Sequence, residues 1–239
     1  MRIKAQIPNL ITLLNLFSGC FALIFAFHQD FKFAFFFVSL GIFFDFFDGF
    51  FARMFKVSSP LGLQLDSLAD MVTSGVVPGV VMYQLMNHAL GFPSFGWPTL
   101  LFPFLGFIIT LGSCYRLANF NVDTRQTDSF IGLPTPANAL FILSLPLILF
   151  DNQYEFITKA LSNEYVLLAI SILSAYILNA EIPLFSLKIK NFSFAKNKLQ
   201  IIFLAISLLF LVFFKILGIP LLILFYILLS VFTNKKKSL

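Results

Sequence analysis

Charged residues are scarce in this sequence. Only 11% of its 239 residues are Asp, Glu, Lys or Arg, whereas a soluble domain carries about 25%. Hydrophobic residues make up 59% of the chain, 35 residues are Phe, and the mean hydropathy is +0.93. This composition excludes an ordinary soluble domain and indicates an integral membrane protein. A chain of this length fits one bundle of six to eight transmembrane helices, with no separate soluble domain.

Cysteine and histidine are also rare. Cys20 and Cys114 lie in apolar segments without a CxxC partner, so we interpret both as buried free thiols. His28 and His88 are the two histidines, and each is predicted at the end of its helix that lies away from the acidic cluster described below. The basic residues do not form a face with interleaved aromatic side chains, which argues against a nucleic-acid partner.

Apolar runs of transmembrane length follow one another along the chain. A helix needs about 20 mostly apolar residues to cross a bilayer. Polar interruptions divide the sequence into eight such segments, at 9–28, 31–55, 61–88, 96–121, 134–150, 163–182, 199–217 and 219–233. The fifth and eighth are short, and the last two can instead form one re-entrant hairpin. The predicted fold is therefore an all-α polytopic bundle of six to eight transmembrane helices.

The sequence also predicts how the chain is organised. No A-x-A cleavage motif follows the first apolar stretch, so we expect that stretch to be retained as a transmembrane helix. Residues 1–192 are predicted to form a membrane domain of about six spans. Residues 193–239 are predicted to add a C-terminal pair of helices and a basic tail to the same bundle.

The distribution of Lys and Arg predicts the orientation. With a cytoplasmic N-terminus and eight spans, 13 of the 16 cations lie on the cytoplasmic side, and the exceptions are Lys32, Lys159 and Lys215. Both termini are therefore predicted to be cytoplasmic. We expect the protein in the cell (inner) membrane, with Lys-rich loops that attract anionic lipid headgroups.

Four of the eleven acidic residues lie between positions 45 and 70. Asp45 and Asp48 are spaced i, i+3 and share one helix face, and Asp66 and Asp70 are spaced i, i+4 and share a face of the next helix. Counted from the turn between the two helices, the members of each pair lie within roughly 3 Å of one depth. If the helices pack antiparallel, all four carboxylates converge on one pocket that opens toward the cytoplasm.

Carboxylates gathered in an apolar bundle require a compensating charge, because an isolated Asp at mid-membrane costs about 2.5–3.5 kcal/mol. One or two divalent cations supply it, and oxygen-only ligands favour Mg²⁺ or Mn²⁺, with Ca²⁺ able to substitute or inhibit. Two alternatives stay open. In the first, some of the acids are protonated or paired with Arg53. In the second, the acids belong to a cation transporter or proton relay, although a transporter usually spreads its acids over more helices.

Small residues accompany the acids. Gly49 follows Asp48 directly, Ala52 lies one turn further, and Gly62 leaves a similar gap on the facing helix. Such a strip admits a flat nucleotide base and a phosphate, which Arg53 can bind as a charged donor. Close packing between helices is the alternative explanation for these small residues.

The arrangement as a whole resembles the signature of the CDP-alcohol phosphatidyltransferase family. The matching pattern is Asp45-x2-Asp48-Gly49-x2-Ala52-Arg53-x8-Gly62-x3-Asp66-x3-Asp70. The resemblance implies that an alcohol attacks the lipid-side phosphate of a CDP-linked lipid and displaces CMP. It also implies that the first three aspartates hold metal, that Asp70 both ligates metal and acts as general base, and that the protein is a homodimer.

Looser motifs resemble the phosphatidylserine synthase branch of that family. They are IPNLITLLNLFSG at 7–19, DSLADMVTSGVVPG at 66–79, YRLANFNV at 115–122, GLPTPAN at 132–138 and SLKIKNF at 186–192. The resemblance implies CDP-diacylglycerol and L-serine as substrates. Members of the branch often have Arg where this chain has Asn119, so no role of that arginine is carried over. Inositol phosphate and glycerol 3-phosphate stay open as other acceptors, although their phosphates call for more cations.

Polar residues outside the signature are candidates for substrate contacts. Arg116, Asn119, Asn121 and Lys188 are predicted on the cytoplasmic side, where they can bind the carboxylate and ammonium of serine. Asn9, Thr12 and Asn15 share one stripe of the first helix and are candidates for nucleotide contacts. The alternatives are interfacial caps for the first set and hydrogen bonds between helices for the second.

Overall fold

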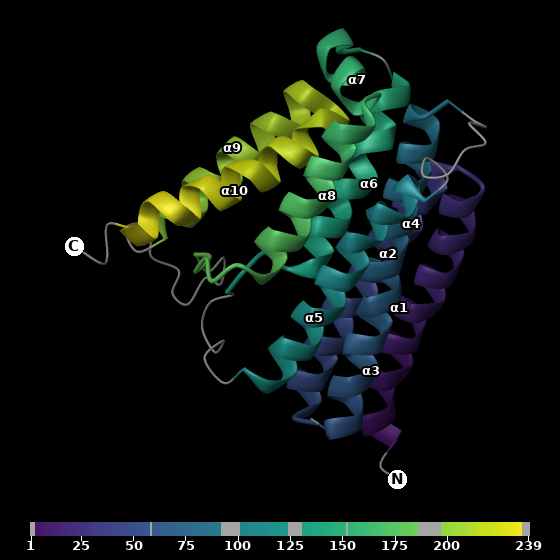
Figure 1. Ribbon diagram of the computed structural model, residues 1–239. Helices are drawn as coiled ribbons and strands as arrows, with labels where there is room; N and C mark the ends of the chain where they lie inside the picture. The colour runs from purple at the N-terminus through teal and green to yellow at the C-terminus, as the bar shows by residue number, and fades with distance from the viewer. Residues whose placement is uncertain are drawn as a thin grey trace.

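The computed structural model describes residues 3–57, 59–91, 101–123, 131–151, 153–185 and 197–235, and in these ranges all regular structure is helical apart from one bridge between Ile131 and Pro183 (Figure 1). The elements in chain order are α1 (Ile3–Phe27), α2 (Phe31–Phe55), α3 (Pro60–Asp70), the π-helical turn η1 (Met71–Val76), α4 (Val77–Ala89), the 3₁₀ helix η2 (Phe102–Phe107), α5 (Ile108–Val122), α6 (Thr135–Asp151), α7 (Glu155–Leu161), α8 (Glu164–Asn179), α9 (Lys198–Phe214), the 3₁₀ turn η3 (Lys215–Leu217) and α10 (Gly218–Lys235). The predicted all-α class is confirmed.

The first two helices form a hairpin that is rich in phenylalanine. The chain reverses at Gln29, which has a left-handed backbone (φ 62°), and the Asp30 side chain caps α2 by accepting a hydrogen bond from Phe33 N at 3.3 Å. The rings of Phe21 and Phe37 stack across the hairpin with centroids 5.1 Å apart. Because α1 and α2 pack along their length, the N-terminal part of α1 faces the C-terminal part of α2, where Asp45 and Asp48 lie.

A single long helix was predicted over 61–88, but the structure interrupts it with a π-helical turn directly after Asp70. Helix α3 begins with residues typical of a helix start: Ser59 Oγ accepts a hydrogen bond from Gly62 N at 2.9 Å, and Pro60 occupies the first turn. The interruption has a local cause. Pro78 lacks an amide hydrogen and cannot donate to the Ser74 carbonyl four residues earlier. Just before it, Val77 N donates to the Val72 carbonyl five residues back, and the Gly75 carbonyl accepts a hydrogen bond from Thr110 Oγ1 of α5 at 3.0 Å.

Helix α4 occupies the centre of the bundle. It packs against α1, η2, α6 and α8, and between Val77 and Met86 every side chain except Tyr83 is buried or part of the core. This burial explains why α4 has no polar face. The helices that surround it expose large apolar side chains such as Phe17, Leu111 and Phe156, as expected for a surface in contact with lipid.

Four described helical runs are long and apolar enough to cross a membrane, at Gln6–Phe27, Phe31–Phe55, Pro60–Ala89 and Lys198–Thr233. A fifth is added if α7 and α8, which meet at an angle of 80°, count as one span. Helix α6 is apolar but has 17 residues, and part of the predicted span 96–121 lies outside the described residues. The structure therefore describes an integral membrane protein with four or five span candidates in its described part.

The C-terminal helices pack side by side and lie at an angle to the rest of the bundle (Figure 1). The chain turns between them at Lys215, whose φ is 50°. Tyr226 Oη of α10 donates a hydrogen bond to the Phe185 carbonyl at 2.9 Å, and Gly132 N donates to the Ile182 carbonyl at 3.0 Å. These bonds connect the C-terminal pair, through residues 182–185, to the segment that precedes α6.

Both cysteines are exposed, so the expectation that they are buried is wrong. The error has a simple origin. In a soluble protein an apolar segment packs inside, but in a membrane bundle apolar residues also cover the surface that faces lipid. Cys20 and Cys114 lie on that surface as free thiols.

Replacing Gly112 with Ala should destabilise the crossing of α5 and α8. A Cβ at this position would lie 2.8 Å from Ala175 Cβ and 2.9 Å from Ala175 Cα, so the two helices must move apart. Overpacking of this kind typically costs about 1–3 kcal/mol, and the variant should unfold at a lower temperature in detergent. Leu111→Ala is the matched control, because the Leu111 side chain is 69% exposed. Equal unfolding temperatures for the two variants would contradict the close helix crossing.

Candidate active site

Three of the four predicted acids meet at one point. Asp45 and Asp48 extend from α2 and Asp66 from α3, and one carboxylate oxygen of each lies within 4.8 Å of the others. Asp48 is buried, and the other two are partly buried. The i, i+3 spacing on α2 and the antiparallel course of α3 produce this convergence, as the sequence predicts.

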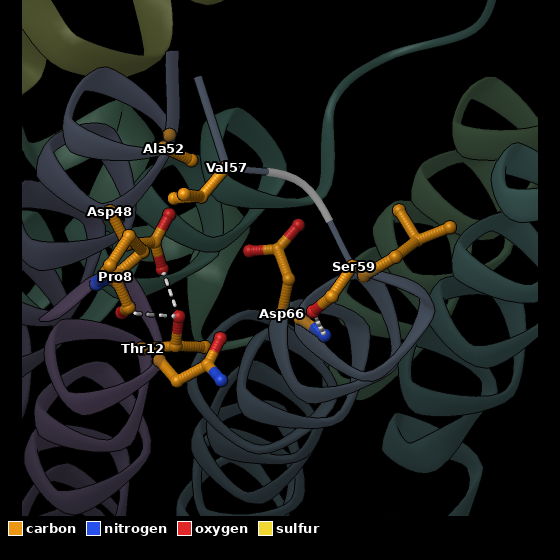
Figure 2. Close-up of a pocket in the computed structure, with 11 residues that line it drawn as sticks. Pro8, Thr12, Asp48, Ala52, Val57, Ser59 and Asp66 are labelled. Atoms are coloured by element: carbon orange, nitrogen blue, oxygen red, sulfur yellow. Dashed lines mark hydrogen bonds between the residues drawn. The ribbon is translucent and has the colours of Figure 1, made fainter. Parts of the chain in front are cut away.

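Helix α1 forms the third wall of the site. Thr12 Oγ1 donates a hydrogen bond to Asp48 Oδ2 at 2.6 Å, and it also lies 3.1 Å from the carbonyl of Pro8 (Figure 2). The hydroxyl has a single hydrogen and can donate to one of these oxygens at a time, and the charged carboxylate is the stronger acceptor. Thr12 therefore fixes the orientation of Asp48. Thr12 also lines the pocket in which the nucleotide is expected.

Asp70 lies one helical turn deeper than Asp66 and outside the group of three. It is 9% exposed, and its Oδ1 accepts a hydrogen bond from Asn15 Nδ2 at 3.1 Å. Its carboxylate also interacts electrostatically with the guanidinium of Arg116. The structure thus brings three carboxylates together and places the fourth apart from them, where it interacts electrostatically with a buried cation.

All the predicted nucleotide residues except Arg53 and Asn15 line a pocket of about 240 Å³ next to the acids (Figure 2). Its walls come from the start of α1, the end of α2 and the first turns of α3, and its lining includes Asn9, Thr12, Asp48, Gly49, Ala52, Gly62 and Asp66. Figure 2 shows Asp48 and Asp66 on opposite sides of the space below Ala52 and Val57. The small residues leave this space open, as the sequence predicts.

Arg53 lies at the edge of this pocket. Its Nη1 is 3.5 Å from the point that a Cβ on Gly49 would occupy, and its side chain is exposed. It also interacts electrostatically with Asp48. A guanidinium in this position can reach a phosphate bound over Gly49.

The donor set fits a divalent cation. All three converging ligands are carboxylates, which Mg²⁺ and Mn²⁺ prefer. Asp66 Oδ1 is buried and has no hydrogen-bond partner in the structure, so it is an oxygen that lacks a positive neighbour. A cation bound here satisfies that oxygen and relieves the repulsion among the three acids.

The predicted acceptor residues are only partly brought together. Arg116 is 7% exposed, and its Nε and Nη2 have no hydrogen-bond partner, which leaves two buried donors near Asp70. Asn119 is exposed. Asn121 instead exchanges hydrogen bonds with Ser67, at 2.9 and 3.2 Å, and so ties α5 to α3. Lys188 lies outside the described residues.

Some pocket residues were not anticipated. Pro8, Val57, Ser59 and Leu63 also line the pocket, although no sequence pattern marks them as site residues. For Asn15 the sequence leaves open a nucleotide contact or a hydrogen bond between helices, and the structure shows the second: Asn15 is fully buried and bonds to Asp70. The signal in the sequence for this contact is the i, i+3 spacing of Thr12 and Asn15, which places both polar side chains on one face of the helix.

The fold and the site together define a helical integral membrane protein with a carboxylate pocket suited to a divalent cation and a phosphate group. Residues 5–177 match the CDP-alcohol phosphatidyltransferase family. The chain belongs to this family.

Curated relatives cover much of the chain. The CDP-diacylglycerol–serine O-phosphatidyltransferase of Helicobacter pylori is 30% identical over 210 residues, which cover 87% of this chain and 81% of that protein. The protein of the same name from Bacillus subtilis is 33% identical over 143 residues, covering 58% of this chain and 74% of the relative. The protein of the same name from Methanocaldococcus jannaschii is 31% identical over 137 residues, which cover 57% of this chain and 58% of that protein.

Replacing Asp66 with Asn should stabilise the metal-free protein and remove its stabilisation by metal. The substitution relieves repulsion within the group of three acids, but it also removes a ligand. For the wild type, Mn²⁺ or Mg²⁺ at 100 times its Kd should stabilise the fold by about 2.7 kcal/mol. Thermal unfolding in detergent, with EDTA and then with Mn²⁺, measures both effects.

The matched control for this experiment is Asp151→Asn. Asp151 is an exposed carboxylate at the other end of the bundle, and its loss should leave the response to metal unchanged. Stabilisation of Asp66→Asn by Mn²⁺ to the same extent as the wild type would refute the assignment of the metal site.

Proposed function

We propose that this protein transfers the phosphatidyl group of CDP-diacylglycerol to the hydroxyl of L-serine, giving phosphatidylserine and CMP. The observation that carries the proposal is the convergence of Asp45, Asp48 and Asp66 within 4.8 Å in a chain of this family. Serine is proposed as acceptor because the relatives reported above are named for it. Asp70 and Arg116, which interact electrostatically, are proposed as the base and the cation for the acceptor.

The carboxylates Asp45, Asp48, Asp66 and Asp70 are proposed to hold one or two Mg²⁺ or Mn²⁺ ions, with Ca²⁺ able to substitute or inhibit. When bound, the metal neutralises charge on the pyrophosphate and favours the departure of CMP. Thr12 keeps Asp48 turned toward the pocket through the 2.6 Å hydrogen bond.

The CDP moiety is proposed to occupy the 240 Å³ pocket. Gly49, Ala52 and Gly62 leave room for the cytosine ring, and the polar side chain of Asn9 lies beside Gly62, with Oδ1 3.2 Å from where a Cβ would stand. Arg53 at the rim binds phosphate. The diacylglycerol portion then extends between helices into lipid.

Transfer needs one proton to be moved and one bond to be exchanged. The serine hydroxyl oxygen attacks the phosphorus that carries diacylglycerol, and Asp70 accepts the hydroxyl proton. The bond from that phosphorus to the bridging oxygen breaks, and CMP leaves with the electron pair. Asp70 is held at a fixed place by Asn15, and its burial excludes competing water.

Arg116 is proposed to bind the carboxylate of serine. Its two unpartnered nitrogens, Nε and Nη2, form the fork that pairs with a carboxylate. Asn119, Asn121 and Lys188 stay proposed as weaker contributors. The hydrogen bonds of Asn121 to Ser67 favour a role in positioning α5.

Another acceptor alcohol, inositol phosphate or glycerol 3-phosphate, is the second candidate within the family. A phosphorylated acceptor brings a second phosphate that needs two or more cations, and in the described part of the chain Arg116 is the buried cation next to Asp70. This favours serine. A cation transporter is less consistent with acids gathered on two consecutive helices.

The membrane arrangement completes the proposal. We propose six to eight spans, cytoplasmic termini, and an active site that faces the cytoplasm from the inner membrane. Residues 1–192 are proposed as the transferase domain and residues 193–239 as a C-terminal addition to the same bundle. The protein is proposed to be a homodimer, as the family resemblance implies.

Substituting Asp70 with Asn should abolish serine-dependent release of CMP. A general base typically contributes about 10²–10⁴-fold to the rate, and Asn cannot accept the proton. The assay uses purified protein in detergent with CDP-diacylglycerol and Mn²⁺ or Mg²⁺, and serine, glycerol 3-phosphate, inositol phosphate or inositol is added singly. Asp151→Asn is the control and should keep full activity.

The pattern of acceptors decides between the candidates in that assay. Release with serine alone supports the proposed reaction. Release with another alcohol would keep the aspartate chemistry and overturn the acceptor. No release with any alcohol from folded protein would overturn the transferase proposal.

Replacing Arg116 with Gln should raise the KM for serine by about 10- to 100-fold, because a charged hydrogen bond contributes about 1.5–3 kcal/mol. The KM for CDP-diacylglycerol should change much less. Arg116→Lys is the matched variant: it keeps the charge but loses the planar fork, and should give an intermediate KM. A KM for serine that stays at the wild-type value in both variants would show that Arg116 does not bind the acceptor.

A further inference from the structure

Asn15 is a fully buried polar side chain near the acids. It lies in α1 and is 0% exposed. An amide in a membrane bundle is costly to bury unless its polar atoms find partners. Asn15 does not line the pocket that contains Gly49 and Gly62, so contact with the nucleotide does not explain it.

Asn15 holds the segment that carries Asp70 at two points. Its Nδ2 donates to Asp70 Oδ1 at 3.1 Å, and its backbone carbonyl accepts a hydrogen bond from Thr73 Oγ1 at 3.2 Å. Thr73 lies in the π-helical turn, three residues after Asp70. One residue of α1 therefore fixes both the carboxylate and the backbone that carries it.

Glycines make this approach possible. A Cβ on Gly19 would overlap the Thr73 hydroxyl, and a Cβ on Gly41 would lie 2.8 Å from Asn15 Oδ1. Both glycines are buried, so α1, α2 and the π-helical turn meet closely at Asn15. The same crowding fixes the amide.

The orientation of the amide follows from charge. With Nδ2 toward Asp70, a donor faces a carboxylate, whereas the flipped amide would direct Oδ1 at the carboxylate and be repelled. Asn15 Oδ1 then points away from Asp70 and has no hydrogen-bond partner. The hydrogen bond to Asp70 is thus favoured even though it leaves the other amide atom unsatisfied.

We propose that Asn15 is a positioning residue for Asp70. Its N–H occupies Oδ1 and stops rotation of the carboxylate, so that Oδ2 is the oxygen left to accept the proton of the acceptor alcohol. Thr73 supports the same geometry by fixing Asn15 against the π-helical turn. This inference rests on the proposed transferase function, because it assigns Asp70 as the base.

Kinetics of matched variants test the inference. Asn15→Asp keeps the shape of the side chain but presents a like charge to Asp70, and Asn15→Ala removes the contact. Both should lower kcat by about 10- to 100-fold, the loss typical of a residue that orients a metal-site ligand, while the KM values for CDP-diacylglycerol and serine stay within about threefold.

Thr73 offers a conservative pair. Thr73→Val removes the hydroxyl at constant shape and should give a smaller loss of kcat, and Thr73→Ser restores the hydroxyl and most of the rate. Ser171→Ala is the control, because that buried hydroxyl bonds to the Leu167 carbonyl in α8, outside the site, and should leave kcat unchanged.

A second readout separates positioning from folding. Thermal unfolding with EDTA and with Mn²⁺ should show that Asn15→Ala is folded and is still stabilised by the ion. Wild-type kcat in the Asn15 variants, or a loss confined to KM or to thermal stability, would overturn the inference.

The proposed function and this inference fail in different ways. The wild-type acceptor pattern tests the function, and the ratio of variant to wild-type kcat, taken with whichever alcohol releases CMP, tests Asn15. A wild-type protein that releases CMP with another alcohol but loses rate in the Asn15 variants supports the inference and overturns only the acceptor. A folded wild type that releases CMP with no alcohol overturns both.

Discussion

Repulsion among carboxylates in apolar surroundings is the constraint on which the rest of this structure depends. Asp45, Asp48 and Asp66 lie within 4.8 Å of one another in a bundle whose surface is largely hydrocarbon. Water does not screen them well at this depth, so each needs a cation or a neutral donor. The bundle supplies neutral donors to Asp48 and Asp70, and leaves the oxygen of Asp66 for a cation.

The neutral donors come from α1, which explains why an apolar N-terminal helix carries a polar stripe. Thr12 serves the shallow carboxylate of Asp48, and Asn15, about one turn along, serves the deeper one of Asp70. The spacing of the donors matches the spacing of the acids because all three helices rise by about 1.5 Å per residue. Depth in the bundle, rather than position in the chain, therefore pairs donors with acids.

The sequence predicts those features that depend on local spacing and hydropathy. Helix α2 has the predicted limits 31–55, and Asp45, Asp48 and Asp66 meet because periodicity alone puts them on facing surfaces. The sequence does not predict features that depend on contacts with a third helix. Asp70 lies outside the group of three and accepts a hydrogen bond from Asn15, and Asn121 bonds to Ser67. The π-helical turn was missed because hydropathy is unchanged across it, although Pro78 was a visible cause.

Charge balance connects the site to the choice of acceptor. In the proposed reaction, two divalent ions would offset the four aspartates, and Arg53 would offset part of the charge of the pyrophosphate. A zwitterion such as serine would add no net charge to such a site, and the unpartnered Nε and Nη2 of Arg116 would be available to its carboxylate. A phosphorylated alcohol would add two negative charges in a medium that screens them poorly. Such an acceptor needs further cations near Asp70, and in the described part of the chain the buried cation that interacts with this aspartate is Arg116. Selectivity for a zwitterion then follows from the same electrostatics that holds the carboxylates in place.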